Sequence, residues 1–71
     1  MNFDMFLEKL YELNTAPIGT KREYWHYSVV KNNEKEYALF YRYENFSTCK
    51  DLVSAISILD AVYRCFHIEF H

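Results

Sequence analysis

Two runs of the chain, residues 23–31 and 36–44, carry aromatic and aliphatic side chains at both odd and even positions. A strand that is buried on one face alternates apolar and polar residues, so each run has more apolar surface than one covered face requires. Residues 32–35 between the runs include two asparagines, which tolerate the left-handed backbone of tight turns. The pattern predicts an antiparallel hairpin of two strands with apolar side chains on both faces.

The faces of this hairpin can be assigned because a loop of two or four residues gives the same parity of pairing. One face is expected to carry Trp25, Tyr27, Val29, Ala38, Phe40 and Arg42. The other is expected to carry Tyr24, His26, Ser28, Val30, Tyr37, Leu39, Tyr41 and Tyr43.

Amphipathic helices are expected on both sides of the hairpin in the sequence. Asn2 is a suitable N-cap for a helix over residues 3–13, and Thr48 with Asp51 has the spacing of a capping box for a helix that carries apolar residues from 52 to 66. From Phe66 onward the residues alternate between apolar and polar, which is also typical of a short third strand. The order predicts one α+β domain, residues 1–71, with both helices on one face of the sheet.

Composition limits the classes of protein that fit. The chain of 71 residues is 51% hydrophobic and 20% aromatic, which can support a small core without a metal or a crosslink. A net charge of −2 with scattered basic residues does not favour nucleic acid as a partner. No apolar stretch is long enough for a membrane span and no export signal opens the chain, so we expect a cytoplasmic protein. Cys49 and Cys65, placed in one helix about 24 Å apart, are expected to be free thiols.

The tyrosine-rich face of the hairpin is the first candidate site. If both helices cover the Trp25 face, the opposite face is left as apolar surface with hydroxyl groups, a composition favoured at protein interfaces. If instead one helix covers each face, the same tyrosines belong to the core. The residues expected to contact a partner are Tyr24, His26, Tyr37, Leu39, Tyr41 and Tyr43.

An acidic row on the first helix is the second candidate. Asp4, Glu8 and Glu12 follow each other at intervals of four residues, where like charges repel by about 0.2 to 0.5 kcal/mol per pair, and the same ridge holds no basic residue to compensate them. Such a row can steer the protein towards a basic surface. The simpler interpretation is a solvated helix face.

Catalytic and cofactor motifs are absent from the sequence. With one glycine the chain has no phosphate-binding loop, and it has no Cys-x-x-Cys pair or nucleophile elbow, so we expect no cofactor and no enzyme activity. Its preference for Phe, Tyr, Ile, Asn and Lys is typical of AT-rich coding, as in phages and mobile elements. We therefore hypothesise an inhibitor of a larger bacterial enzyme or nucleic-acid-binding defence complex, of the anti-CRISPR or anti-restriction type, that acts by steric occlusion. The alternatives are a homodimeric regulator and a single-stranded nucleic-acid binder that uses the tyrosines as a stacking platform.

Overall fold

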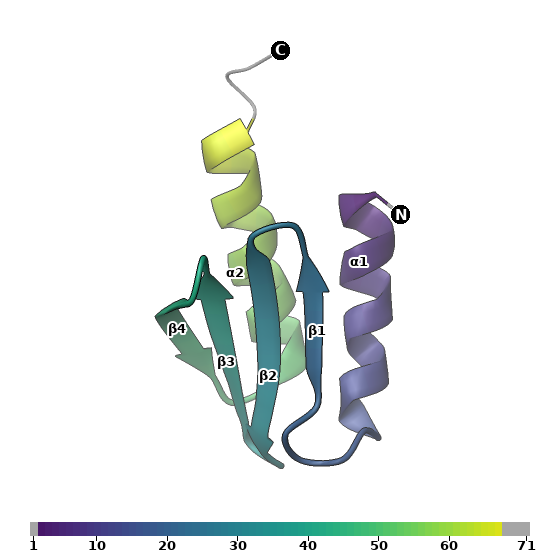
Figure 1. Cartoon of the computed structure of the whole chain (residues 1–71). Coiled ribbons are helices and arrows are strands. Elements are labelled where there is room, and N and C mark those ends of the chain that lie inside the picture. The colour runs from purple at the N-terminus through teal and green to yellow at the C-terminus, as the bar shows by residue number, and fades with distance from the viewer. Residues whose placement is uncertain (1, 68–71) are drawn as a thin grey trace.

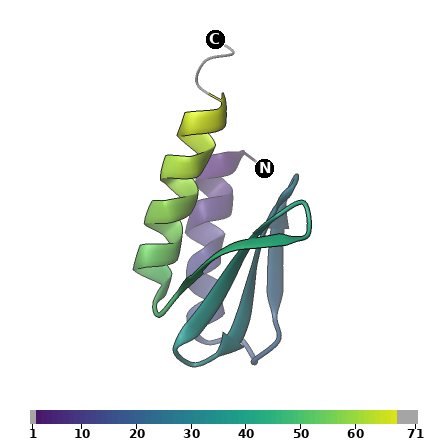
Figure 2. The same ribbon diagram turned by 90° about the vertical axis from the view of Figure 1, so that its left-hand side faces the viewer.

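Two helices pack on one face of a four-stranded antiparallel sheet in the computed structural model, which describes residues 2–67 (Figures 1 and 2). The strands follow one another in the sheet in chain order, β1-β2-β3-β4. The α+β class predicted from the sequence is confirmed. The elements are α1 (Phe3–Lys9), which continues as the 3₁₀ helix η1 (Leu10–Asn14), then β1 (Lys21–Tyr24), β2 (Tyr27–Asn33), β3 (Glu36–Tyr41), β4 (Glu44–Cys49) and α2 (Leu52–His67).

The predicted two-stranded hairpin is wrong, because each of its runs contains a tight turn. Trp25 and His26 connect β1 to β2, and Arg42 and Tyr43 connect β3 to β4. The turns use positive φ angles of 54° at Trp25, 52° at Arg42 and 80° at Tyr43. Such angles normally select glycine, asparagine or aspartate, so these bulky residues gave no turn signal in the sequence.

The predicted assignment of faces is also wrong, and a β-bulge is the cause. Next to the β2–β3 turn Asn33 pairs with Glu36, but beyond the bulge Lys31 pairs with Tyr37, which leaves Asn32 as an extra residue. One extra residue in one strand reverses the parity of every later pair. Val29 therefore lies opposite Leu39 and not opposite Phe40.

The hydrophobic core lies between the helices and the sheet face that holds the odd-numbered residues of β2 and β3. Each fully buried aliphatic or aromatic side chain there stabilises the fold by about 1.5 to 3 kcal/mol relative to exposure. The core residues are Phe3, Phe6, Leu10 and Leu13 of α1 and η1, Tyr27, Val29, Tyr37, Leu39 and Cys49 of the sheet, and Leu52, Ala55 and Leu59 of α2. Within residues 2–67 no helix has the length and apolar character needed to cross a membrane.

Helix α2 begins and ends differently from the prediction. Its N-cap is Asp51, whose Oδ1 accepts a hydrogen bond of 2.7 Å from the backbone N–H of Ser54, whereas Thr48 and Cys49 belong to β4. Cys49 is buried and Cys65 is exposed, and both are free thiols. The helix continues through Phe66 and His67, so a third strand starting at Phe66 is wrong there, and residues 68–71 of that prediction lie outside the described residues.

Candidate binding site at the turn end

The β1–β2 and β3–β4 turns lie together at one end of the sheet, which we call the turn end (Figure 1). They are joined by a hydrogen bond of 2.9 Å from the backbone N–H of Arg42 to the backbone carbonyl of His26. Among the described residues, the non-glycine residues with positive φ are Trp25, Arg42 and Tyr43, all at this end. A left-handed backbone costs about 1 to 2 kcal/mol per residue, and strain of this kind tends to concentrate at functional sites.

The side chains of the turn end project into solvent. Trp25 is 80% exposed and Tyr43 is 97% exposed, so neither ring contributes much to the core. Phe66, at the end of α2, is also largely exposed, and its ring stacks on that of Tyr41 with 6.3 Å between centroids. The turn end thus presents Trp, Tyr and Arg side chains, the residue types that contribute most often to the energy of protein interfaces.

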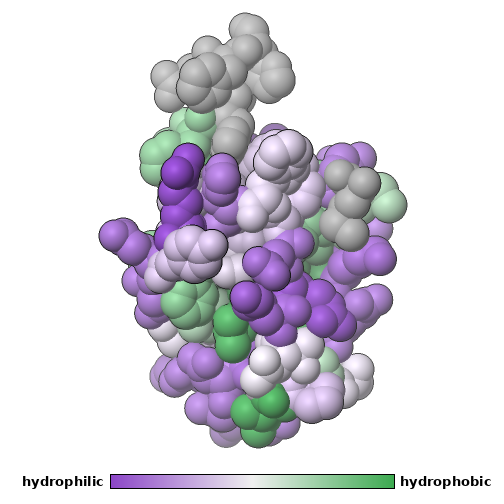
Figure 3. All heavy atoms as spheres, in the orientation of Figure 1, coloured by the Kyte–Doolittle hydropathy of each residue, from purple (hydrophilic) through white to green (hydrophobic). Residues whose placement is uncertain are grey.

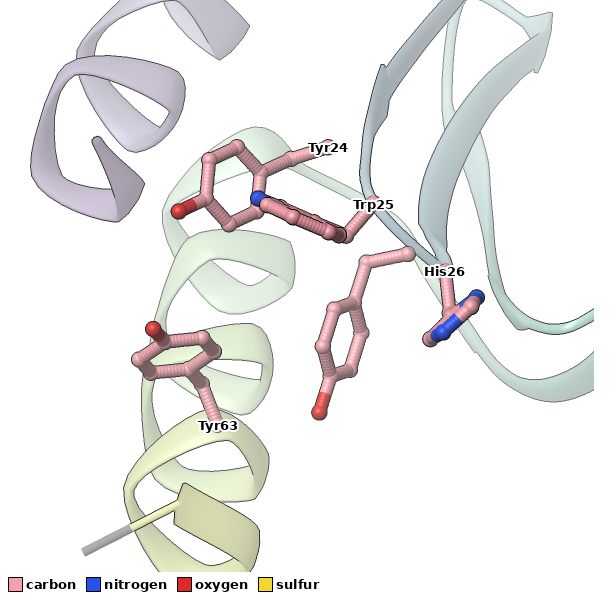
Figure 4. A pocket seen from close by; sticks show the side chains of 5 residues that line it. Tyr24, Trp25, His26 and Tyr63 are labelled. Carbon is pink, nitrogen blue, oxygen red and sulfur yellow. The ribbon is translucent and has the colours of Figure 1, made fainter. Parts of the chain in front are cut away.

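A pocket of about 330 Å³ opens at the turn end between the sheet and α2. It is lined by Tyr24 from β1, Trp25 and His26 from the turn, Tyr27 from β2 and Tyr63 from α2. Tyr24 and Trp25 lie side by side, and Tyr63 faces them from α2 (Figure 4). His26 lies apart from these three rings, next to the strands.

Phe3 of helix α1 packs against two of the rings that line this pocket. The ring of Phe3 stacks on Tyr63 at 3.8 Å with an interplanar angle of 8°, and it meets Tyr24 edge to face at 5.7 Å. Burial raises the pKa of the Tyr63 phenol, and the neighbouring Tyr24 and the carboxylate of Asp4 raise it further. Burial likewise raises the pKa of Tyr27, with added contributions from Tyr41 and Tyr63. These phenols are therefore neutral at physiological pH.

The predicted tyrosine face is not an exposed surface, because the helices cover it. Tyr37 is 3% exposed and Leu39 is fully buried, so a partner cannot reach them in the folded chain. Tyr24 and Tyr41 are half-buried, and Tyr41 packs against Tyr27 at 5.1 Å between ring centroids.

Of the residues predicted to contact a partner, the structure brings His26 and Tyr43 to an exposed position, both at the turn end. Prediction from the sequence missed Trp25, Arg42, Tyr63 and Phe66 as site residues, since Trp25 and Arg42 were expected under the helices. The length of the two runs was a usable signal of the turns inside them, because each run is longer than the mean strand of about 5 to 6 residues.

The acidic row is exposed, as expected for a helix surface, but it is not without compensation. Arg22 from the neighbouring strand β1 reaches Glu12, with 3.7 Å between Nη2 and Oε1. At the other end of the row, the carboxylate of Asp4 acts on Tyr63 and raises the pKa of its phenol.

The sheet face that points away from the helices has a mixed character. Hydrophobic and hydrophilic side chains alternate across the surface seen in Figure 3, without one continuous apolar patch. Val30 and Phe40 are half-buried on this face and Ala38 is buried. In the part of the chain that the structure describes, no three His, Cys, Asp or Glu side chains are grouped to hold a metal ion.

Comparison with known proteins adds no family: no family model matches the chain, and no curated protein or solved structure is significantly similar to it.

Proposed function

We propose that this chain is a small non-enzymatic protein-binding module that inhibits a larger bacterial protein by occupying its surface. The observation that carries the proposal is the turn end, where exposed Trp25 and Tyr43 stand on strained turns beside Arg42. Backbone strain lowers the stability of the folded chain and the exposed rings add little to it, so an interface that uses them gives a physical reason for both.

The target class in this proposal is an enzyme or nucleic-acid-binding defence complex, as for anti-CRISPR or anti-restriction inhibitors. The exposed acidic residues Asp4 and Glu8 on α1 support it, because they suit a surface that normally holds a phosphate backbone. The mechanism is steric occlusion in the cytoplasm. Tyr24, His26 and Tyr41 take part at the rim of the contact, while Tyr37 and Leu39 act only by supporting the sheet.

Capture of a partner by tagged protein tests this proposal. Wild-type protein and the double variant Trp25→Ala/Tyr43→Ala are incubated with bacterial lysate, and bound proteins are quantified by mass spectrometry. A matched control is Tyr11→Ala/Val53→Ala, which removes two other exposed apolar side chains, one from η1 and one from α2.

We expect one protein or complex to bind the wild type and the control and to be lost with the turn-end variant, while the melting temperature of all three remains similar. The purified partner must then lose activity when the wild-type chain is added. A partner that the turn-end variant retains, or one whose activity is unaffected, contradicts the proposal.

A single-stranded nucleic-acid binder is a second candidate, because Trp25 and Tyr43 lie beside Arg42 and can offer stacking surfaces worth about 1 to 3 kcal/mol per base. The basic residues of β1 argue against it, since Lys21 pairs with Glu23 and Arg22 pairs with Glu12. Fluorescence of Trp25, the single tryptophan, measured with oligonucleotides at low salt decides the question. Quenching that disappears with added salt supports this candidate, and unchanged fluorescence eliminates it.

A further inference from the structure

The walls of the turn-end pocket are aromatic rings that meet at steep angles. Tyr24 and Trp25 have centroids 6.4 Å apart and planes inclined by 69°, Tyr24 and Tyr63 are 6.4 Å apart at 67°, and Tyr27 and Tyr63 are 6.1 Å apart at 59°. Rings arranged in this way enclose a space from several sides (Figure 4). The volume of about 330 Å³ is enough for the end of one long side chain, and it lies at the lower limit for ligand pockets in general.

The chemistry of this space favours a cation. The face of an aromatic ring is negative, and a cage of such rings is the usual recognition element for alkylated ammonium groups. Among the described residues no lysine or arginine lines the pocket, while the carboxylate of Asp4 lies close enough to Tyr63 to affect its phenol. The same end of the molecule already holds one such contact within the chain, with the guanidinium carbon of Arg42 at 5.7 Å from the centroid of the Tyr41 ring.

We infer that the pocket between Tyr24, Trp25, Tyr27 and Tyr63 receives the cationic end of a lysine or arginine side chain supplied by the partner. The inference rests on the proposed function and specifies the chemistry of the partner surface. The carboxylate of Asp4 acts on Tyr63, and exposed Glu8 follows on the same helix, so the neighbouring surface of the partner is basic as well.

Binding of a small cation to the isolated chain tests the inference without knowledge of the partner. The probe is butylguanidinium, its neutral near-isostere butylurea is the control ligand, and butylammonium represents the lysine side chain. Binding is followed by Trp25 fluorescence and by NMR shifts of the amides of residues 24–27 and 63. We expect butylguanidinium or butylammonium to bind about 5- to 30-fold more tightly than butylurea, because only the cations gain the interaction with the rings.

Variants assign the binding to the pocket. Trp25→Ala and Tyr63→Leu are expected to reduce the affinity for the cation to that for butylurea, whereas Tyr63→Phe keeps the ring and retains binding even if the leucine variant folds poorly. Tyr11→Leu, which alters an exposed tyrosine of η1, should bind as the wild type does. Equal binding of butylurea and butylguanidinium, or shifts confined to Glu8 and Glu12, overturns the inference.

The inference and the proposed function fail in distinguishable ways. If the cations do not bind but Trp25→Ala/Tyr43→Ala loses its protein partner, the inference is wrong and the proposed function stands. If the cations bind in the pocket but no protein partner depends on the turn end, the cation site stands. Its assignment to a side chain of a partner is then wrong, and so is the proposed function.

Discussion

Tyr43 combines two unfavourable properties for a folded chain, a φ of 80° and a side chain that is 97% exposed. Its ring does not pack in the core, so folding by itself gives no reason to keep a bulky residue in a left-handed turn. Trp25 poses the same question in the other turn of this end, with a φ of 54°. Residues of this kind are expected where binding is selected at the expense of stability.

Replacement of Tyr43 by glycine separates these two effects. Glycine adopts positive φ freely, so Tyr43→Gly should be about 0.5 to 1 kcal/mol more stable than Tyr43→Ala, after allowance for the greater entropy of glycine in the unfolded chain. Urea unfolding of the two variants measures the difference. We also expect both variants to lose partner affinity. A glycine variant less stable than the alanine variant would show that the turn is not strained.

Lys31 is a buried cation of β2 with its charge satisfied inside the fold. It is 1% exposed, and its Nζ donates hydrogen bonds of 2.9 Å to the carbonyl of Ala16 and 3.2 Å to that of Asn14, at the end of η1. The carboxylate of Glu34, 3.5 Å away, is itself mostly exposed. Lys31 thus ties the end of the first helical segment to the centre of the sheet, where the dipole of a helix end favours a positive charge.

Removal of this amine should therefore be costly. Lys31→Ala is expected to lower the free energy of unfolding by about 2 to 4 kcal/mol, because two charged hydrogen bonds are lost from a buried position. Lys35→Ala in the β2–β3 turn is the matched control, and as an exposed substitution it should change stability by less than about 0.5 kcal/mol. Chemical denaturation of both proteins decides this, and equal stabilities would mean that Lys31 is dispensable.

At the scale of elements, the bulge at Asn32 accommodates one extra residue of β2, so that Val29 can pair with Leu39 on the face towards the helices. Deletion of Asn32 should be tolerated, because the pairs Asn33–Glu36 and Lys31–Tyr37 then follow each other in a continuous ladder and Val29 still lies opposite Leu39. Asn32→Ala keeps the residue count and loses only the exposed hydrogen bond of 2.8 Å to Glu36, so it should fold with a small loss of stability. Circular dichroism during thermal unfolding compares the two. A deletion variant that no longer unfolds cooperatively would contradict this role of the bulge.

The start of α2 gives a prediction about pH. A hydrogen bond from the backbone N–H of Ser54 lowers the pKa of the Asp51 carboxyl from its ordinary value of 3.8. A hydrogen bond with the Ser54 side chain lowers it further. Because the folded chain holds this carboxylate ionised, its stabilisation is complete above the unfolded pKa and is lost as the pH falls through the lower folded value. Asp51→Ala should therefore lower the melting temperature at pH 7 and have little effect below the folded pKa.

Asp51→Asn serves as the control for the ionisation. It keeps an oxygen acceptor for the cap but has no charge to lose, so its stability should depend less on acid pH than that of the wild type. Melting temperatures from pH 7 down to pH 2 test both variants. A difference between wild type and Asp51→Ala that does not change with pH would exclude a role for the charge.

For the whole molecule, we expect a monomer and not the homodimer of the alternative hypothesis. The large core side chains are covered within one chain, and the outer sheet face does not form a continuous apolar patch (Figure 3). Stable dimers usually bury an extensive apolar area. We expect light scattering at about 50 µM to report a monomer.

A dimer in that measurement would point to the exposed edge of the sheet at β4. Phe46 is the bulged residue of that strand and is 39% exposed, so Phe46→Lys should then restore a monomer. Persistence of the dimer in that variant would place the contact elsewhere.

The two helical regions were predictable from the sequence because helix periodicity is a local property: each apolar stripe follows from spacing within its own segment. The first was predicted close to its observed extent, and the second was predicted with Thr48 in place of Asp51 as its N-cap. The strands were harder, because their turns consist of Trp25, His26, Arg42 and Tyr43, none of which is a typical turn residue. In the candidate site, Tyr24, His26 and Tyr43 were predicted as contact residues, whereas the pocket was not.

The sequence by itself determined that the chain has two amphipathic helices, a run of aromatic strands and more apolar surface on those strands than a simple hairpin needs. The tertiary structure alone decided which rings are buried and which are exposed. One extra residue at Asn32 places Tyr37 in the core, and two tight turns bring Trp25 and Tyr43 into solvent. The physical reason is that burial on a sheet depends on pairing parity between strands, and pairing is a relation between distant residues that no local pattern records.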